Sequence, residues 1–282
     1  MRSRVEYPPD RPSTSATRRL RRVSAAIHST QIGESGARVV FLHGLFGQGK
    51  NFTRVAKALQ PEATSLLVDL PNHGRSAWTQ RADYRDMAAD VAEHLERGFA
   101  ADGPVHVIGH SMGGKVAMVL ALTRPELVDR LVVADIAPEP NGGSGEFEHL
   151  LSSLASIDVK TLKRRSDADE QLREKIPDDT VRGFLLQNLR SAPDGYEWQA
   201  NLDVLRRDLP TIGDFPFVDA TFDHPVLWVA GEHSDYIQDR HAERMRSYFP
   251  RTRLVTIKGA GHWVHSEQPE AFVSALRVFL EL

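Results

Sequence analysis

The sequence contains no cysteine, which excludes disulfide bonds, thiolate metal sites and a cysteine nucleophile. It also lacks an apolar run of the roughly 18 residues that would suggest a membrane span. Charge of neither sign dominates, because the formal net charge of the 282 residues is −3, so no global attraction to nucleic acid or an anionic membrane is expected. The histidines lack the paired spacing of metal ligands, and we expect neither a metal nor another cofactor. This composition is compatible with the cytoplasm, which is the expected location.

What is present is the composition of a globular protein, with 41% hydrophobic and 26% charged residues. The length allows one large domain with an insertion. Residues 1–24 differ from the rest, because seven arginines occur by Arg22 and residues 8–12 are turn-prone. They lack the apolar core of a secretory signal, so we expect a disordered basic leader, with a basic docking tail as the alternative.

Short apolar runs bounded by turn residues alternate with helical patterns along the rest of the chain. Such runs are typical of strands buried on both faces of a parallel sheet. The expected strands are Val39–Leu42, Ser65–Val68, Val105–Ile108, Leu131–Ala134, Val226–Ala230 and Arg253–Ile257. Their alternation with helices predicts an α/β fold with a doubly wound, mostly parallel sheet and helices on both faces.

One interval, between Ala134 and Val226, breaks this order. Its apolar residues recur with helical spacing, in the groups Phe147, Leu150, Leu151 and Leu154, then Val181, Phe184, Leu185 and Leu189, then Trp198, Leu202 and Leu205. Short helices cannot bury their apolar faces alone, so we expect them to form a cap on the main domain. The predicted core is residues 25–138 and 222–282, and the predicted helical cap is residues 139–221. An independent domain is the alternative.

The strongest motif is the sequence Gly-His-Ser-Met-Gly at Gly109–Gly113, which lies between an expected strand and an expected helix. A serine hydroxyl is a weak nucleophile unless it is exposed beside a base. A sharp strand–turn–helix elbow exposes the serine, and flanking glycines allow the close chain approach that this turn requires. The motif predicts Ser111 as a catalytic nucleophile.

A second motif, His-Gly-Leu-Phe-Gly at His43–Gly47, follows the first expected strand. It places backbone N–H groups at the carboxyl edge of the sheet, beside the elbow. Acyl transfer develops a negative oxygen that two preorganised N–H donors can bind. We predict that the N–H groups of Leu45 and Met112 form this oxyanion hole, and that His43 orients the loop.

A third motif, Gly-Ala-Gly-His-Trp at Gly259–Trp263, follows the last expected strand. Its loop returns His262 to the edge where Ser111 lies, so His262 is the predicted general base. His265 is the rival, but no glycine loop comes immediately before it.

The acid that should orient this base is less clear from the residues alone. Enzymes that place a serine and a histidine at the edge of such a sheet usually carry the acid three residues after a glycine that follows the penultimate strand. Here that glycine is Gly231, and the slot holds Ser234, with Asp235 displaced by one residue. Asp135, at the carboxyl end of the strand after the elbow, is a second candidate, and Asp203 in the cap is a third.

Four segments together resemble one branch of the α/β-hydrolase superfamily. They are His43–Gly47, Asp69–Ser76, Gly109–Met118 and Val133–Pro138. This branch comprises the bacterial YbfF-type esterases and the related mitochondrial abhydrolase-domain esterases, and the similarity covers roughly residues 25–282. YbfF-type esterases are similar to this chain in having Asp-Ile-Ala-Pro after the strand and Gly-x-x-Ser at the usual acid slot. The resemblance therefore favours Asp135, and it implies the α/β-hydrolase fold and hydrolysis of carboxylic esters without a cofactor.

The expected activity is that of a serine esterase acting on a small-molecule ester with a short to medium acyl chain. Phe46, Trp198 and Trp263 are candidates for an apolar substrate pocket. An acyltransferase or a thioesterase would use the same acyl-enzyme, and a small-molecule receptor could retain the same residues, so these three remain alternatives.

Overall fold

The computed structural model describes residues 24–141 and 144–282. The predicted basic leader lies outside the described residues except for its last residue, Ser24.

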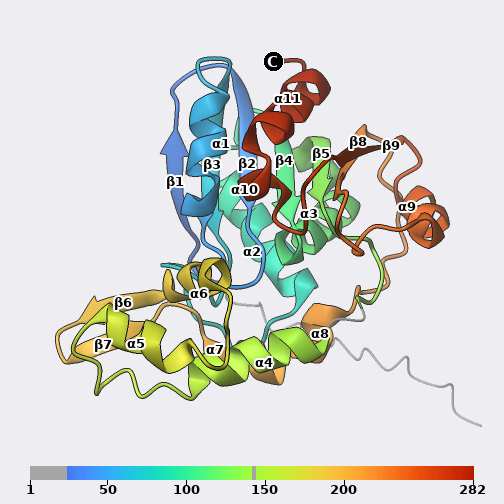
Figure 1. Ribbon diagram of the computed structural model, residues 1–282. Coiled ribbons are helices and arrows are strands. Elements are labelled where there is room, and N and C mark those ends of the chain that lie inside the picture. Colours follow the sequence, from blue (N-terminus) through green and yellow to red (C-terminus); the bar gives the residue numbers. More distant parts are fainter. Residues whose placement is uncertain (1–23, 142–143) are drawn as a thin grey trace, which may run out of the picture.

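The main sheet has seven strands in the order β1-β3-β2-β4-β5-β8-β9 (Figure 1). These are β1 (His28–Ile32), β2 (Ala37–Leu42), β3 (Ala63–Asp69), β4 (Val105–His110), β5 (Val128–Ala134), β8 (Val226–Gly231) and β9 (Thr252–Ile257). All six predicted strands fall within β2 to β9, and every pairing among those strands is parallel. The predicted α/β-hydrolase fold with its mostly parallel sheet is confirmed.

Strand β1 was not predicted. It pairs antiparallel with β3 at the edge of the sheet, and each of its residues is half-buried or exposed. Its sequence, His-Ser-Thr-Gln-Ile, has no apolar run because an edge strand needs no fully buried face. The strand signal that identifies buried strands is therefore absent here.

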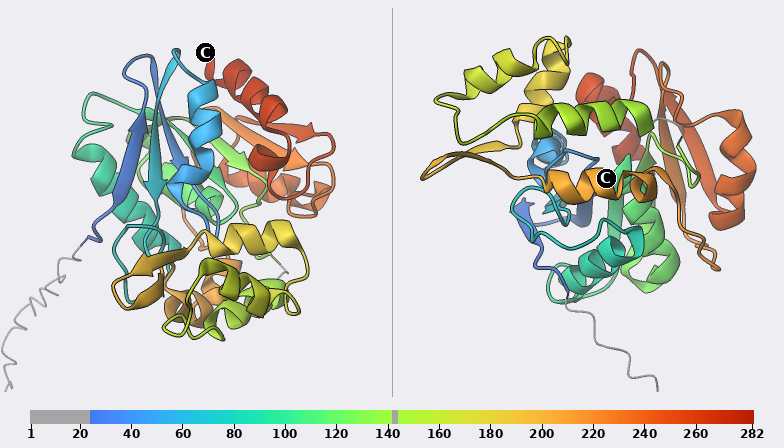
Figure 2. Two further views of the ribbon diagram at one scale, coloured as in Figure 1. Left: turned by 60° about the vertical axis from the view of Figure 1, so that its left-hand side comes forward. Right: turned by 90° about the horizontal axis from the view of Figure 1, so that it is seen from below.

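Helices cover both faces of the sheet (Figure 2). The main ones are α1 (Thr53–Ala58), α2 (Tyr84–Glu96), α3 (Met112–Thr123), α9 (Ala242–Tyr248), α10 (Val264–Glu267) and α11 (Pro269–Leu280), with 3₁₀ turns η1 (Gly49–Phe52), η2 (Pro125–Leu127) and η3 (Asp239–His241). Alternate residues of β2 belong to different cores: Val40 and Leu42 pack with α2 and α3, while Val39 and Phe41 pack with α1 and α11. This is the doubly wound arrangement that repeated strand–helix order produces.

The segment between β5 and β8, which we call the insertion (residues 139–221), lies along one end of the sheet (Figure 1). Its elements are α4 (Ser144–Ala155), α5 (Arg165–Leu172), α6 (Asp179–Leu186), β6 (Leu189–Ala192), β7 (Gly195–Trp198), α7 (Leu202–Arg207) and α8 (Leu209–Gly213). The hairpin of β6 and β7 differs from the expectation of helices alone. Its turn, Ala192–Gly195, has the sequence Ala-Pro-Asp-Gly, with Gly195 at φ 116°, which is a turn signal that helical periodicity overlooks. Trp198 lies in the hairpin and not in a helix.

A buried lysine fastens both ends of the insertion to the core. The Nζ of Lys115, in α3, donates to Oδ1 of Asn141 at 2.5 Å, to the carbonyl of Gly213 at 3.0 Å and to that of Asp214 at 2.7 Å. Asn141 lies near the start of the insertion, before α4. The carbonyls of Gly213 and Asp214 lie near its other end, where α8 ends. Lys115 is 1% exposed, so water does not compete for these three bonds. The insertion is thereby anchored one turn of helix away from Ser111.

Candidate active site

Ser111 occupies the sharp turn between β4 and α3. Its backbone angles are φ 52° and ψ −120°, a region that costs energy for any residue with a side chain. A Cβ on Gly113 would stand 2.3 Å from the carbonyl oxygen of Leu42, and one on Gly109 would stand 2.3 Å from that of Gly113. Only glycine fits at these two positions, and this explains the motif around the serine.

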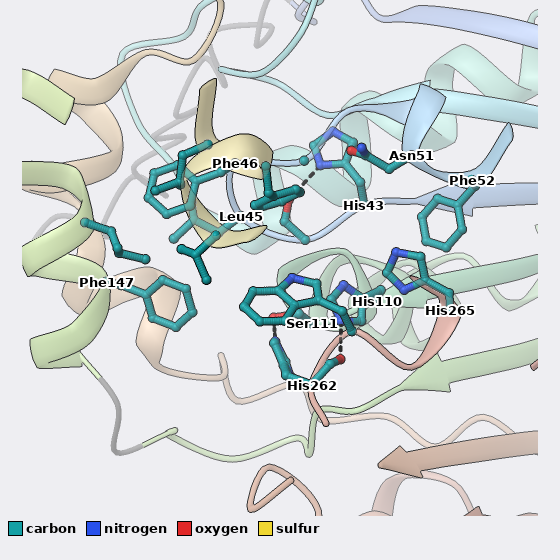
Figure 3. Close-up of a pocket in the computed structure, with 17 residues that line it drawn as sticks. His43, Leu45, Phe46, Asn51, Phe52, His110, Ser111, Phe147, His262 and His265 are labelled. Atoms are coloured by element: carbon teal, nitrogen blue, oxygen red, sulfur yellow. Dashed lines mark hydrogen bonds between the residues drawn. The ribbon is translucent and has the colours of Figure 1, made fainter. Parts of the chain in front are cut away.

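The ring of His262 reaches Ser111 from the loop after β9. Its Nε2 lies 3.0 Å from the Oγ of Ser111, and its Nδ1 lies 2.8 Å from Oδ2 of Asp135. Figure 3 shows the His262 ring against Ser111 at the centre of a pocket. The three side chains form one hydrogen-bonded series from a hydroxyl to a carboxylate.

Asp135 is completely buried at the carboxyl end of β5, and its φ is 53°. Besides His262, its carboxylate accepts hydrogen bonds from the backbone N–H of Gly231, at 3.0 Å, and from the hydroxyl of Ser234. Such partners offset the free energy that burying a carboxylate costs. The slot after β8 thus holds a hydroxyl that supports Asp135.

The other two candidate acids lie elsewhere. Asp235 is exposed, and its Oδ1 accepts from Nε2 of Gln238 at 3.2 Å. Asp203 is exposed on α7 in the insertion. Of the three carboxylates, the structure brings only Asp135 to the His262 ring.

The rival base, His265, packs among aromatic rings instead of contacting Ser111. Its ring centroid lies 4.6 Å from that of Phe52 and 4.7 Å from that of His110. Burial lowers the pKa of His265 to about 3, and it lowers the pKa of His110 well below its ordinary value. Both rings are therefore neutral near pH 7 and add no positive charge beside His262.

Stacked rings hold the orientation of His262. Tyr236 stacks on it with 4.1 Å between ring centroids and 26° between planes, and Trp263 meets it edge-on at 5.8 Å. His110 packs against it at 4.8 Å and bonds through Nε2 to the His262 carbonyl at 2.8 Å. Burial raises the pKa of Tyr236 to about 12, so its hydroxyl remains protonated. The sequence analysis did not identify Tyr236, because no local pattern marks a ring that stacks across loops.

Two backbone N–H groups lie near Ser111: that of Leu45, in the loop after β2, and that of Met112, the residue after Ser111. The loop after β2 is held in place by His43, with Nδ1 donating to the carbonyl of Gly44 at 2.8 Å and Nε2 accepting from the N–H of Leu70 at 2.9 Å. Within the described residues the N–H of Leu45 has no hydrogen-bond partner. Met112 is the first residue of α3, and the N–H groups of a helix's first turn have no partner within the helix. Both groups are available to a bound oxygen.

Two small cavities reach Ser111. The larger, about 30 Å³, is lined by His43, Gly44, Leu45, Phe46, Gly47, Asn51, Phe52, His110, Ser111, Phe147, Leu150, Val181, Phe184, Leu185, His262, Trp263 and His265 (Figure 3). The smaller, about 20 Å³, lies between Leu45, Phe147 and Met112. Phe46 and Trp263 thus line the larger cavity, whereas Trp198 lines neither. The insertion contributes an apolar wall, of which Phe147 borders both cavities.

In residues 24–141 and 144–282, no group of three or more histidine, cysteine, aspartate or glutamate side chains is arranged to hold a metal ion. In the same ranges, every helix is too short or too polar to span a membrane.

Comparison with known proteins places the site in context. A model of the alpha/beta hydrolase family matches residues 39–275. The mouse sn-1-specific diacylglycerol lipase ABHD11 is 37% identical over 249 residues, which cover 86% of this chain and 80% of the mouse protein. Esterase YbfF of Escherichia coli strain K12 is 33% identical over 242 residues, covering 86% of this chain and 92% of that protein. A solved structure of a marine microorganism esterase has a TM-score of 0.87 and 35% identity, and the match covers 91% of this chain and all of that one.

Proposed function

The chain belongs to the alpha/beta hydrolase family and is a carboxylic ester hydrolase of the YbfF-type branch, and we propose that it acts through an acyl-enzyme on Ser111. The observation that carries the proposal is the series of bonds from Ser111 through His262 to Asp135, at 3.0 and 2.8 Å. These are hydrogen-bond distances at which a base can accept the proton of a nucleophile.

In the first half-reaction, Nε2 of His262 accepts the hydroxyl proton while Oγ of Ser111 bonds to the ester carbonyl carbon. The carbonyl oxygen becomes an oxyanion that accepts hydrogen bonds from the N–H groups of Leu45 and Met112. The ester C–O bond then breaks, and His262 gives its proton to the departing alcohol. In the second, His262 takes a proton from water while the water oxygen bonds to the acyl carbon. The bond between that carbon and Oγ then breaks, and His262 returns the proton to Oγ, which releases the acid and restores the Ser111 hydroxyl.

Asp135 supports both steps. Its bond to Nδ1 leaves Nε2 as the nitrogen that accepts the proton, and its negative charge stabilises the imidazolium that forms. The bonds from Gly231 and Ser234 keep this carboxylate in place.

The proposed substrates are small esters with short to medium acyl chains. A water molecule needs a cavity of roughly 10–15 Å³, so without movement of side chains the cavity of about 30 Å³ takes about two or three groups of that size and the cavity of about 20 Å³ takes about one or two. The apolar lining favours an acyl chain without charge. The mouse relative's name refers to a diacylglycerol, so a diacylglycerol belongs among the substrates tested.

The proposal is tested by turnover of p-nitrophenyl esters from acetate to palmitate and of a diacylglycerol, with and without added alcohol. Intact-mass measurement under rapid quench should detect the acyl group on wild-type protein and not on Ser111→Ala. Ser111→Ala should lower kcat by about 10⁶, as in a comparable serine hydrolase. Ester products formed with added alcohol would indicate an acyltransferase, and a single turnover without a second would indicate a receptor. Undiminished turnover by Ser111→Ala would contradict the proposal.

A further inference from the structure

The turn that carries Leu45 has an unfavourable backbone at its third residue. The N–H of Gly47 donates to the carbonyl of Gly44 at 2.9 Å, which closes a four-residue turn. Phe46, the third residue, has φ 62°, a value that turns of this kind usually assign to glycine or asparagine. The chain therefore needs external contacts to keep a phenylalanine in this conformation.

Two side chains hold the Phe46 backbone from opposite sides. From the core, Nε2 of His73 accepts the Phe46 N–H at 3.3 Å. From the insertion, Nδ2 of Asn188 donates to the Phe46 carbonyl at 2.7 Å. Phe46 is 2% exposed, so water does not replace either contact.

Asn188 is itself fixed in place. It is completely buried between α6 and β6, and its Nδ2 also donates to the carbonyl of Leu185 at 3.2 Å. Its Oδ1 accepts from Nε2 of Gln48 at 3.3 Å, and its backbone carbonyl accepts from the N–H of Gln199 at 2.7 Å. Both polar atoms of the Asn188 side chain therefore have hydrogen-bond partners. One of these partners, Gln48, comes directly after the turn that contains Phe46.

We propose that Asn188 is a positioning residue for the oxyanion hole: by holding the Phe46 carbonyl, it fixes the N–H of Leu45 where the developing oxyanion needs it. The inference rests on the proposed function. Asn188 touches neither Ser111 nor the reacting atoms, and it acts through the turn. The insertion therefore does more than cover the pocket. The N–H of Leu45 is held in the position that the oxyanion requires only while Asn188 donates its hydrogen bond to the Phe46 carbonyl.

The effect should appear in the transition state more than in substrate binding. A ground-state carbonyl depends little on the hole, whereas the tetrahedral oxyanion depends on donors at 2.7–3.1 Å. A displacement of about 1 Å in a positioned group can cost about 100-fold in rate. Loss of the Asn188 contact should thus lower kcat and leave KM nearly unchanged.

The test uses the full chain with Asn188→Ala and Asn188→Asp. Aspartate keeps the size of the side chain but places an oxygen where Nδ2 donates to the carbonyl. Kinetics are measured with p-nitrophenyl butyrate, together with the Ki of butylboronic acid, whose serine adduct puts a tetrahedral oxygen in the hole. For both variants we expect kcat to fall about 10- to 100-fold, and Ki to rise by a similar factor.

The matched control is Asn201→Ala. Asn201 is also a buried asparagine of the insertion that bonds to a core loop, donating from Nδ2 to Oδ1 of Asn72 at 3.0 Å, but it does not touch the turn. It should lower thermal stability without the loss in kcat or the rise in Ki. Equal kcat and Ki in the Asn188 and Asn201 variants would overturn the inference. If Asn188→Ala does not fold, Asn188→Asp carries the comparison.

Failure of the proposed function would give a different result: the boronic acid would not inhibit the wild type, and Ser111→Ala would remain active.

Discussion

Asp135 and His262 are 127 positions apart in the chain, yet the carboxylate of one and Nδ1 of the other lie 2.8 Å apart. β8 stands between β5, which ends just before Asp135, and β9, which precedes the His262 loop. The loop after β8 lies between them and contributes the Ser234 hydroxyl and the Gly231 N–H, both of which donate to Asp135. The carboxylate thus comes from the end of β5. The loop after β8, which carries the acid in most enzymes of this fold, here donates hydrogen bonds to that carboxylate.

Asp135→Asn should therefore lower kcat by about 10⁴, as the equivalent change does in a serine protease, because His262 would favour the wrong tautomer. Asparagine tolerates the positive φ of 53° at this position, so the fold should persist. Ester turnover and thermal melting of Asp135→Asn and Asp235→Asn check this together. A large loss of kcat in Asp235→Asn with little loss in Asp135→Asn would refute the assignment.

Ser234→Ala should have a smaller effect. It removes one donor from a buried carboxylate that keeps its bonds to Gly231 and His262. A hydrogen bond to a charged group contributes about 1.5–3 kcal/mol, and a loss of tenfold in rate corresponds to about 1.4 kcal/mol. We expect kcat to fall about tenfold, with a restored rate in Ser234→Thr, which keeps the hydroxyl. A kcat for Ser234→Ala equal to that of the wild type would show that the two remaining bonds suffice.

The elbow and the His262 loop could be predicted because their signals are local. Glycines at fixed offsets from Ser111 and His262 report the close chain approaches that each turn requires. The position of Asp135 is different, because its proximity to His262 depends on strand order, which a single sequence reveals only through resemblance. Tyr236 and Asn188 could not be found, since their roles arise from contacts between segments that no periodicity connects. β1 and the β6–β7 hairpin were missed because short strands at an edge or in an insertion need no buried apolar run.

Phe147→Ala should extend the range of acyl chains accepted. Its side chain borders both cavities beside Ser111, and Figure 3 shows it at the opposite end of the pocket from Phe52. Removing the ring joins two spaces that separately take only about two or three and about one or two small groups. The ratio of kcat/KM for p-nitrophenyl octanoate to that for the acetate should rise about tenfold or more, since each buried methylene contributes about 0.8 kcal/mol. Trp198→Ala, in the hairpin, should leave this ratio unchanged; an equal shift in both variants would contradict the role given to Phe147.

Buried histidines should make the fold sensitive to acid. Burial lowers the pKa of both His73 and His265 to about 3, whereas the ordinary value for an unfolded histidine is about 6.5. Between these two values the unfolded chain binds protons that the folded chain does not. The free energy of unfolding must therefore decrease as the pH falls from about 6.5 toward 3. From pH 7 to pH 5, each such histidine should cost about 2 kcal/mol, which urea unfolding at the two pH values can measure.

His265→Phe isolates one of these contributions. The Nδ1 of His265 is buried without a hydrogen-bond partner in the described part of the chain, and Phe52 and Phe272 already pack against the ring. The substitution therefore removes a titrating group and no recorded hydrogen bond. The loss of unfolding free energy between pH 7 and pH 5 should shrink by about 2 kcal/mol relative to the wild type. His233→Phe, at an exposed histidine in the loop after β8, is the control and should leave that loss unchanged. If His265→Phe loses as much stability on acidification as the wild type, the ring of His265 takes up its proton in the folded protein as readily as in the unfolded chain.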